Sequence, residues 1–132
     1  MINLGINAAA KRAKLQELVQ IERDRRLLEN FVFAGEPFDF DADSQQNITG
    51  AGASAGFAIG AGALPGDLRW ADPYTDFVWL DKNNSYMSMD AQTCFAFSQA
   101  AMQHKSAHIF AARALKDMDP IPDDFTDDVY WP

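Results

Sequence analysis

The chain has 132 residues, of which 48% are apolar and 23% charged, and its formal net charge is −8 at pH 7. This length predicts one modest core, and the acidic balance disfavours nucleic acid and anionic membrane surfaces as partners. Cys94 is the only cysteine, so an internal disulfide and a secreted disulfide scaffold are excluded. Neither a signal-peptide pattern nor a long strongly apolar run is evident, so we expect synthesis in a cytoplasm without stable membrane insertion.

A helix is predicted over residues 8–30, which are rich in Ala, Leu, Glu, Lys, Arg and Gln and contain no Gly or Pro. Five positions follow the four-three spacing of a coiled-coil seam: Lys14, Leu18, Ile21, Arg25 and Leu28. Because two of these positions are basic, a helix docked on its own domain fits the same pattern. We expect residues 1–30 to serve attachment or oligomerisation, with four candidate contact residues: Leu15, Leu18, Ile21 and Leu28.

A β-hairpin is predicted over residues 31–40, with Ala34-Gly35 as its turn. Phenylalanines alternate on both sides of this turn, so four rings can share one face: Phe31, Phe33, Phe38 and Phe40. Pro37 has no N–H to donate, which places its strand at an edge or at a bulge.

A Gly- and Ala-rich helix is predicted next, from an Asp43-x-x-Gln46 capping box to about Gly62. Its glycines come close to the spacing of a dinucleotide-binding loop, but the preceding residues indicate a helix start and not a strand. Interspersed polar residues disfavour the second interpretation, a membrane-seeking peptide. We therefore interpret three glycines as close-packing positions, although glycine weakens a helix: Gly52, Gly56 and Gly60.

A small antiparallel meander is predicted from strands near residues 68–71, 76–81 and 86–89. Phe77 and Trp79 would share one face of the middle strand, and a turn is expected at residues 83–85.

The last predicted helix covers residues 91–117 and is capped by Asp90. One face follows three- and four-residue steps: Phe97, Ala101, His104, His108, Ala111 and Leu115. His104 and His108 have the spacing of two ligands of one metal, but no third ligand is evident. We expect no metal, no cofactor and no enzymatic activity. The alternative among enzymes is a metal-dependent hydrolase that uses these two histidines.

Residues 119–132 form an acidic and aromatic tail, predicted to be extended because it has three prolines and no helical or strand period. Six acidic residues lie between 117 and 128, and six basic residues lie between 11 and 26. These regions can pair within the chain or between copies, or can form two solvated surfaces. Its apolar residues indicate that the tail lies on its own domain or on a neighbouring protein. Our candidate is contact with a neighbour through three otherwise unused residues: Phe125, Tyr130 and Trp131.

The elements together predict an α+β fold: N-terminal helix, β-hairpin, Gly/Ala-rich helix, small antiparallel meander, C-terminal helix and extended tail. The predicted division of the chain is an attachment segment at 1–30, a compact domain at 31–118 and the tail at 119–132.

Residues 21–117 carry a combination of motifs: the helix end IERDRR, the run FDFDADSQQNI after an aromatic hairpin, a Trp strand, a second aromatic strand, and a last helix that ends in RALKD. In this combination the chain resembles an uncharacterised domain found in tail and tail-fibre proteins of tailed bacteriophages and prophages. One departure is Ala34-Gly35, where Asn-Gly or Asp-Gly is more usual. The resemblance carries over no catalytic residues.

This resemblance implies a structural component of a phage tail, in the baseplate or tail-fibre region, that acts in the virion through protein–protein contacts. The expected partners are other tail proteins and further copies of the chain, as a trimer or a hexamer. A tail-fibre assembly chaperone that does not remain in the virion is the alternative.

Overall fold

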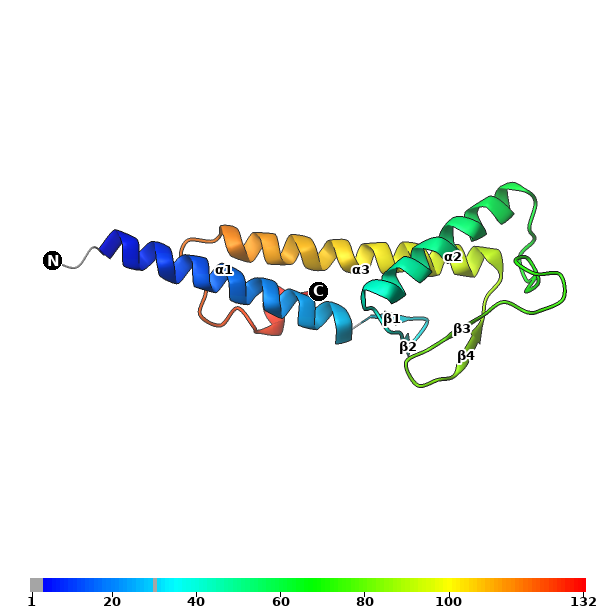
Figure 1. Cartoon of the computed structure of the whole chain (residues 1–132), viewed down its shortest axis with the longest axis horizontal. Helices are drawn as coiled ribbons and strands as arrows, with labels where there is room; N and C mark the ends of the chain where they lie inside the picture. The colour runs from blue at the N-terminus through cyan, green and yellow to red at the C-terminus, as the bar shows by residue number, and fades with distance from the viewer. Residues whose placement is uncertain (1–3, 30) are drawn as a thin grey trace. The chain divides into compact units, whose positions relative to one another are not determined.

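The computed structural model describes residues 4–29 and 31–132 (Figure 1). The helices are α1 (Leu4–Glu29), α2 (Ala42–Gly60), α3 (Ala91–Asp117) and the short 3-10 helix η1 (Asp128–Tyr130). The strands are β1 (Val32–Phe33), β2 (Glu36–Pro37), β3 (Val78–Leu80) and β4 (Tyr86–Ser88). Each antiparallel sheet has two strands, β1 with β2 and β3 with β4. The predicted α+β fold is therefore confirmed.

The chain forms two compact units. Unit 1 combines the chain up to Leu27 with Lys105–Pro132, and unit 2 is Leu28–His104. Helix α3 therefore contributes its last part to unit 1 and its first part to unit 2. Each unit contains residues from more than one of the three ranges predicted from the sequence, 1–30, 31–118 and 119–132. The separate roles expected for these ranges stay a prediction.

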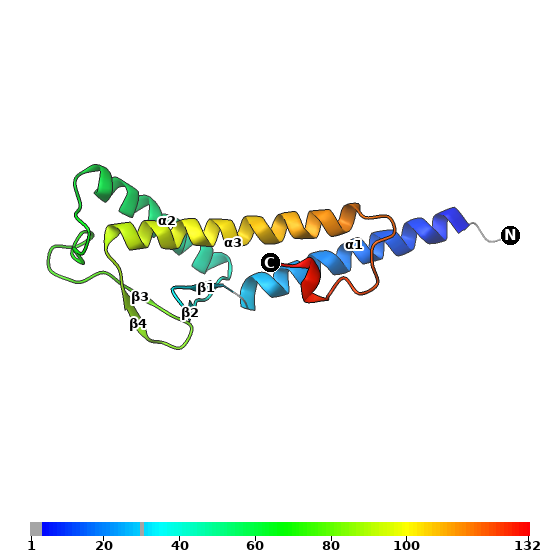
Figure 2. The same ribbon diagram turned by 180° about the vertical axis from the view of Figure 1, so that it is seen from behind.

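Unit 1 is built from α1, the end of α3 and the chain that follows α3. Both views show this last segment turning back along α1 (Figures 1 and 2). Its buried residues include an apolar cluster, called here the unit 1 cluster: Val19, Ala112, Leu115, Ile121, Phe125 and Trp131. Helix α1 is thus docked within its own unit, and it begins at Leu4, four residues before the predicted start.

Unit 2 contains an aromatic core around the β1–β2 hairpin. The turn has positive φ at Ala34 (52°) and Gly35 (79°), as a tight two-residue hairpin turn requires. Phe33 and Phe38 lie 5.2 Å and 4.8 Å from the ring of Phe97 on α3. Phe31 contacts Phe38, Phe40 and Phe97, which confirms that the hairpin rings gather together.

The capping box predicted at Asp43 and Gln46 is wrong, because α2 begins two residues earlier. Its N-cap is Asp41, which is extended and accepts a hydrogen bond from the Ser44 amide at 2.8 Å. This bond lowers the pKa of Asp41. Asp43 lies inside the first turn, where its charge favours the helix N-terminus.

The first strand of the predicted meander is also wrong, because residues 68–71 form turns and not a strand. The Asp67 carboxylate accepts from the Arg69 amide, and the Asp72 carboxylate accepts from the Tyr74 amide, both at 2.9 Å. Such local bonds compete with a strand ladder.

The β3–β4 hairpin keeps the expected alternation. Phe77 and Trp79 lie 6.2 Å apart, and Trp79 also contacts Phe97. Asn84 has a φ of 63° in the turn, which confirms the turn predicted there.

Helix α3 has the predicted bounds and the predicted buried face. Asp90 caps it, accepting from the Thr93 amide at 2.7 Å. Four residues of the predicted face are buried, and the other two are partly buried, His104 and Ala111.

The three candidate glycines of α2 differ in their surroundings. A Cβ added at Gly52 would lie 2.1 Å from Ser98 Oγ and 2.3 Å from Ser98 Cβ, so α2 and α3 approach closely there. At Gly56 a Cβ would meet the Phe95 ring at 3.6 Å, an ordinary contact, and at Gly60 it would meet nothing within 4 Å. The close-packing interpretation therefore fits Gly52, fits Gly56 weakly and is wrong for Gly60.

Candidate functional site: the docked C-terminal segment

The C-terminal segment, residues 119–132, returns from the end of α3 to lie in unit 1. Arg12 on α1 fixes the point where it leaves α3. Its guanidinium donates to the carbonyl of Met118 at 2.7 Å and to the carbonyl of Lys116 at 2.8 Å. Carbonyls at a helix C-terminus lack intrahelical partners, so a cation is a favourable ligand for them.

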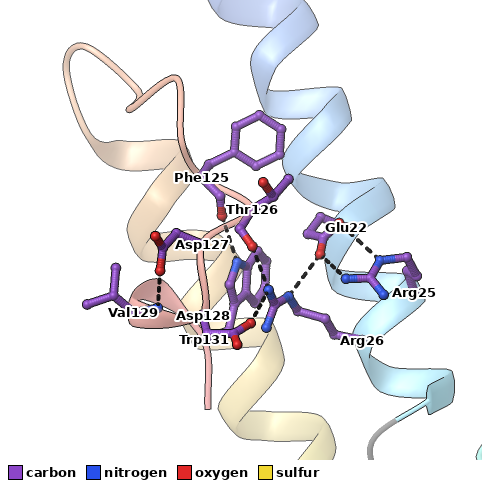
Figure 3. Close-up of polar contacts among 9 residues, drawn as sticks. All are labelled: Glu22, Arg25, Arg26, Phe125, Thr126, Asp127, Asp128, Val129 and Trp131. Carbon is purple, nitrogen blue, oxygen red and sulfur yellow. Dashed lines mark hydrogen bonds and ion pairs between the residues drawn. The ribbon is translucent and has the colours of Figure 1, made fainter.

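The segment is folded upon itself. The Asp127 amide donates to the Asp124 carbonyl at 2.9 Å, and the Asp127 side chain caps η1 by accepting from the Val129 amide at 3.0 Å. The Trp131 indole N–H donates to the Phe125 carbonyl at 2.8 Å, which closes a loop (Figure 3). Phe125 and Trp131 are buried in the unit 1 cluster. The tail is therefore compact at this end, and the expectation of an extended chain is wrong there.

The buried guanidinium of Arg26 joins α1 to this loop (Figure 3). It donates to Glu22 Oε1 at 2.9 Å, to the Thr126 carbonyl at 2.6 Å and to Asp128 Oδ1 at 2.8 Å. Its central carbon lies 5.3 Å from the centre of the Trp131 ring, within cation–π range. We call these five residues the Arg26 clasp: Glu22, Arg26, Thr126, Asp128 and Trp131.

The buried Arg26 guanidinium has a carboxylate partner on each of two segments, Glu22 on α1 and Asp128 on the C-terminal segment. The Arg26 side chain is only 7% exposed, whereas that of Asp128 is 95% exposed. Glu22 accepts from Arg25 as well as from Arg26. These bonds, Arg25 first, lower the pKa of Glu22 against the opposing effect of burial. Because Glu22 remains charged, it orients Arg26 and compensates its burial.

A cavity of about 480 Å³ lies between α1 and the start of the segment. Ala8, Leu15 and Ile121 supply part of its apolar wall. Lys11 and Asp123 also line it, so opposite charges flank an apolar space.

The candidate contact residues of α1 fall into two groups. Leu15 and Leu18 pack against the unit 1 cluster, whereas Ile21 and Leu28 are 56% and 46% exposed. Of the tail candidates, Phe125 and Trp131 are buried and Tyr130 packs against the same cluster. The premise that these three residues are unused is therefore wrong, and their contact with a neighbouring protein stays a prediction.

The histidines and the cysteine take part in packing. His104 lies 5.2 Å from Phe31 and 5.0 Å from Phe40, and the His108 ring stacks on Trp131 at 6.5 Å. Burial raises the pKa of Cys94 to about 11. In the part of the chain that the structure describes, no group of three or more metal-binding side chains is found.

Sequence reasoning missed the Arg26 clasp. The available signals were the ERDRR motif and the opposite charges of residues 11–26 and 117–128. Both were compatible with pairing between copies, so the partner of Arg26 could not be assigned from spacing alone.

The chain matches, over residues 9–129, the family described as domain of unknown function (DUF4376). It belongs to this family. The matched range begins in α1 and ends inside η1, so the family domain includes four of the five clasp residues and excludes Trp131. It also extends beyond residues 21–117, which carried the resemblance noted from the sequence.

No curated protein and no solved structure matches the chain. Among the residues described, none of the helices combines the length and apolarity that a membrane crossing requires.

Proposed function

We propose that the chain is a structural component of a bacteriophage tail, in the baseplate or tail-fibre region. The resemblance of residues 21–117 to tail-protein domains supports a place in the tail. The observation that carries a role in protein–protein contact is an exposed apolar face on the β3–β4 hairpin of unit 2.

This face consists of the exposed side chains of β3 and β4, which alternate along each strand with partly buried side chains. Leu80 and Tyr86 are directly opposite each other in the ladder, and Val78 lies two residues before Leu80. Their exposures are 40% for Val78, 47% for Leu80 and 75% for Tyr86. The intervening Trp79 and Met87 are partly buried. A β-ribbon that is apolar on both faces is suited to covering by a second protein.

The partners in this proposal are other tail proteins and further copies of the chain, as a trimer or a hexamer. Closed cyclic symmetry is the common solution for such oligomers. The chain is then assembled in the host cytoplasm and resides in the virion tail.

Quantitative mass spectrometry of purified virions tests this proposal. A structural component is present at a fixed number of copies per particle. A tail-fibre assembly chaperone occurs in infected cells and is absent from purified virions, and that result would overturn the proposal.

The exposed face is tested by Leu80→Glu, which places a charge at its centre. We expect incorporation into virions to fall by about tenfold or more, since loss of one well-packed contact residue exceeds about 1.4 kcal/mol. Tyr74→Glu is the matched control, because Tyr74 is 86% exposed in the same unit but lies outside the hairpin. Equal incorporation of both variants and the unaltered chain would show that this face makes no essential contact.

A further inference from the structure

The β3–β4 hairpin is a two-stranded antiparallel ribbon, in which hydrogen-bonded and non-hydrogen-bonded residue pairs alternate. Two bonds identify the hydrogen-bonded pairs. The Asp81 amide donates to the Ser85 carbonyl at 2.9 Å. At the other end, the Met89 amide donates to the Phe77 carbonyl at 3.0 Å. Two pairs are therefore of the other kind, with N–H and C=O groups that point outward from the ribbon: Val78 with Ser88 and Leu80 with Tyr86.

Strand β4 is an open edge of this ribbon. Within residues 4–29 and 31–132, the backbone groups of Tyr86 and Ser88 make no hydrogen bond. The other strand has a neighbour within the chain, since the Lys82 amide directly after β3 donates to the Pro37 carbonyl of β2 at 2.8 Å. The outward N–H and C=O groups of β4 are thus available to another chain.

The β4 edge also lacks the features that discourage pairing with another strand. Proteins commonly protect an edge strand with charged side chains, a proline or a bulge. Residues 83–89, NNSYMSM, contain no charged residue and no proline. The pairing of β4 with β3 is regular and contains no bulge. An unprotected edge with open donors and acceptors is a template for a further extended chain.

The side chains of the ribbon indicate which kind of chain fits beside β4. Tyr86 belongs to the exposed apolar face, whereas Met87 lies on the opposite face and is partly buried. Because side chains alternate along a strand, an added strand extends both faces at once. A charged side chain there would lose water without gaining a partner on β4. A third strand also stabilises a hairpin that is marginal as two strands.

We propose that β4 is a strand-addition site, at which an extended, uncharged segment of another protein pairs with the backbone of Tyr86 and Ser88. These two residues offer two N–H donors and two C=O acceptors. The main-chain bonds supply affinity, and the neighbouring side chains favour apolar residues at alternate positions of the added strand. This inference rests on the protein–protein contact that the proposed function assigns to the β3–β4 hairpin, and it specifies the form of that contact.

Amide hydrogen exchange of the full 15N-labelled chain, followed by NMR, tests the proposal. The probes are short blocked peptides in which threonine alternates with valine or with leucine. At a peptide concentration about ten times the Kd, we expect exchange of the Tyr86 and Ser88 amides to slow about tenfold. The amides of Val78 and Leu80 on the other edge should exchange as before. Unchanged exchange at Tyr86 and Ser88 at every soluble peptide concentration would overturn the proposal.

The same measurement without peptide distinguishes a second copy of the chain from a different protein as the occupant. We expect exchange of the Tyr86 and Ser88 amides to be independent of the concentration of the chain. Protection that rises with this concentration would assign the edge to a second copy and would overturn the assignment to another protein.

Ser88→Pro and Ser88→Ala are a matched pair of variants. Proline removes the outward N–H of Ser88 and leaves the bonds between β3 and β4 in place, whereas alanine keeps this N–H. We expect Ser88→Pro to bind the peptides at least about tenfold more weakly than Ser88→Ala, because it loses a donor and its ring obstructs the approach of a strand. Equal affinities of the two variants would contradict strand addition.

Peptides that are N-methylated at alternate residues apply the same test without altering the chain. Methylation on the edge that faces β4 removes the donors of the added strand, so we expect no protection of Tyr86 and Ser88. Protection equal to that by the unmethylated peptide would show that the contact does not use the backbone.

The failure of this inference is distinguishable from that of the proposed function. Unprotected Tyr86 and Ser88 amides in a chain that is abundant in virions would overturn strand addition alone. Protection by the peptides in a chain that is absent from virions would overturn the tail role alone.

Discussion

Arg26 shows how one side chain can determine the path of a chain end at the scale of single residues. Its charge is buried and therefore requires partners, which Glu22 supplies from α1 and Asp128 and Thr126 supply from the C-terminal segment. Glu22 and Arg26 are one helical turn apart, so the orientation of the guanidinium is set locally. The C-terminal segment then binds the Arg26 Nη2 group through the Thr126 carbonyl and the Asp128 carboxylate.

Replacement of Arg26 by leucine should destabilise unit 1. We expect the free energy of unfolding to fall by about 3 kcal/mol, because the clasp is lost while Glu22 stays buried. Urea unfolding followed by tryptophan fluorescence measures this change. Lys14→Leu is the control, since Lys14 forms an exposed ion pair with Glu17 and its loss should change stability by less than about 1 kcal/mol. Equal effects of the two variants would contradict a role for the clasp in stability.

Acid should weaken the clasp through Glu22. Its pKa in the folded chain lies below the ordinary value of 4.5, so the folded state binds the proton less tightly than the unfolded state. The stabilisation by Glu22 is therefore fully present above about pH 4.5 and is lost as the pH falls through the folded pKa. We expect Glu22→Gln to lower stability at pH 7 by about 1.5–3 kcal/mol and to flatten its dependence on pH below 4.5.

Unfolding free energies measured between pH 3 and pH 7 check this prediction. Glu17→Gln is the control, because its carboxylate is exposed and pairs only with Lys14 among the ion pairs described. An unchanged acid slope in Glu22→Gln would show that another group governs the loss of stability.

Among the elements, α2 and the predicted meander show what local pattern could and could not predict. Helix α3 and both hairpins followed directly from periodicity, Asp90 and turn residues. The N-cap of α2 was misplaced because Asp41 and Asp43 both precede helix-forming residues, and only backbone geometry distinguishes them. The strand at 68–71 failed because Asp67 and Asp72 bind nearby amides.

Helix α2 also supports a prediction based on two of its glycines. Gly52→Ala should destabilise unit 2 by about 1–3 kcal/mol, because the new Cβ overlaps Ser98. Gly50→Ala should instead stabilise it by about 0.5–1 kcal/mol, since no neighbour lies within 4 Å and alanine favours the helix. Thermal unfolding followed by circular dichroism compares the two variants. The packing interpretation of Gly52 fails if both alanines raise the melting temperature.

For the whole molecule, the sequence predicted the fold class but not the grouping of its elements. Opposite charges at the two ends of the chain indicated that they could pair, yet that pattern is the same for contacts within one chain and between copies. Burial of Phe125 and Trp131 depends on apolar residues of both α1 and α3, which come together only after the helices pack. From the sequence the tail could lie on its own domain or on a neighbour, and the structure places its buried apolar residues in unit 1.

The place of the chain in a phage particle is the central claim, and a reconstruction of the virion by electron cryomicroscopy tests it most directly. We predict density for the chain in the baseplate or tail-fibre region, in several symmetry-related copies, with the β3–β4 face against another protein. Density for the complete tail that leaves no room for this chain would contradict the account.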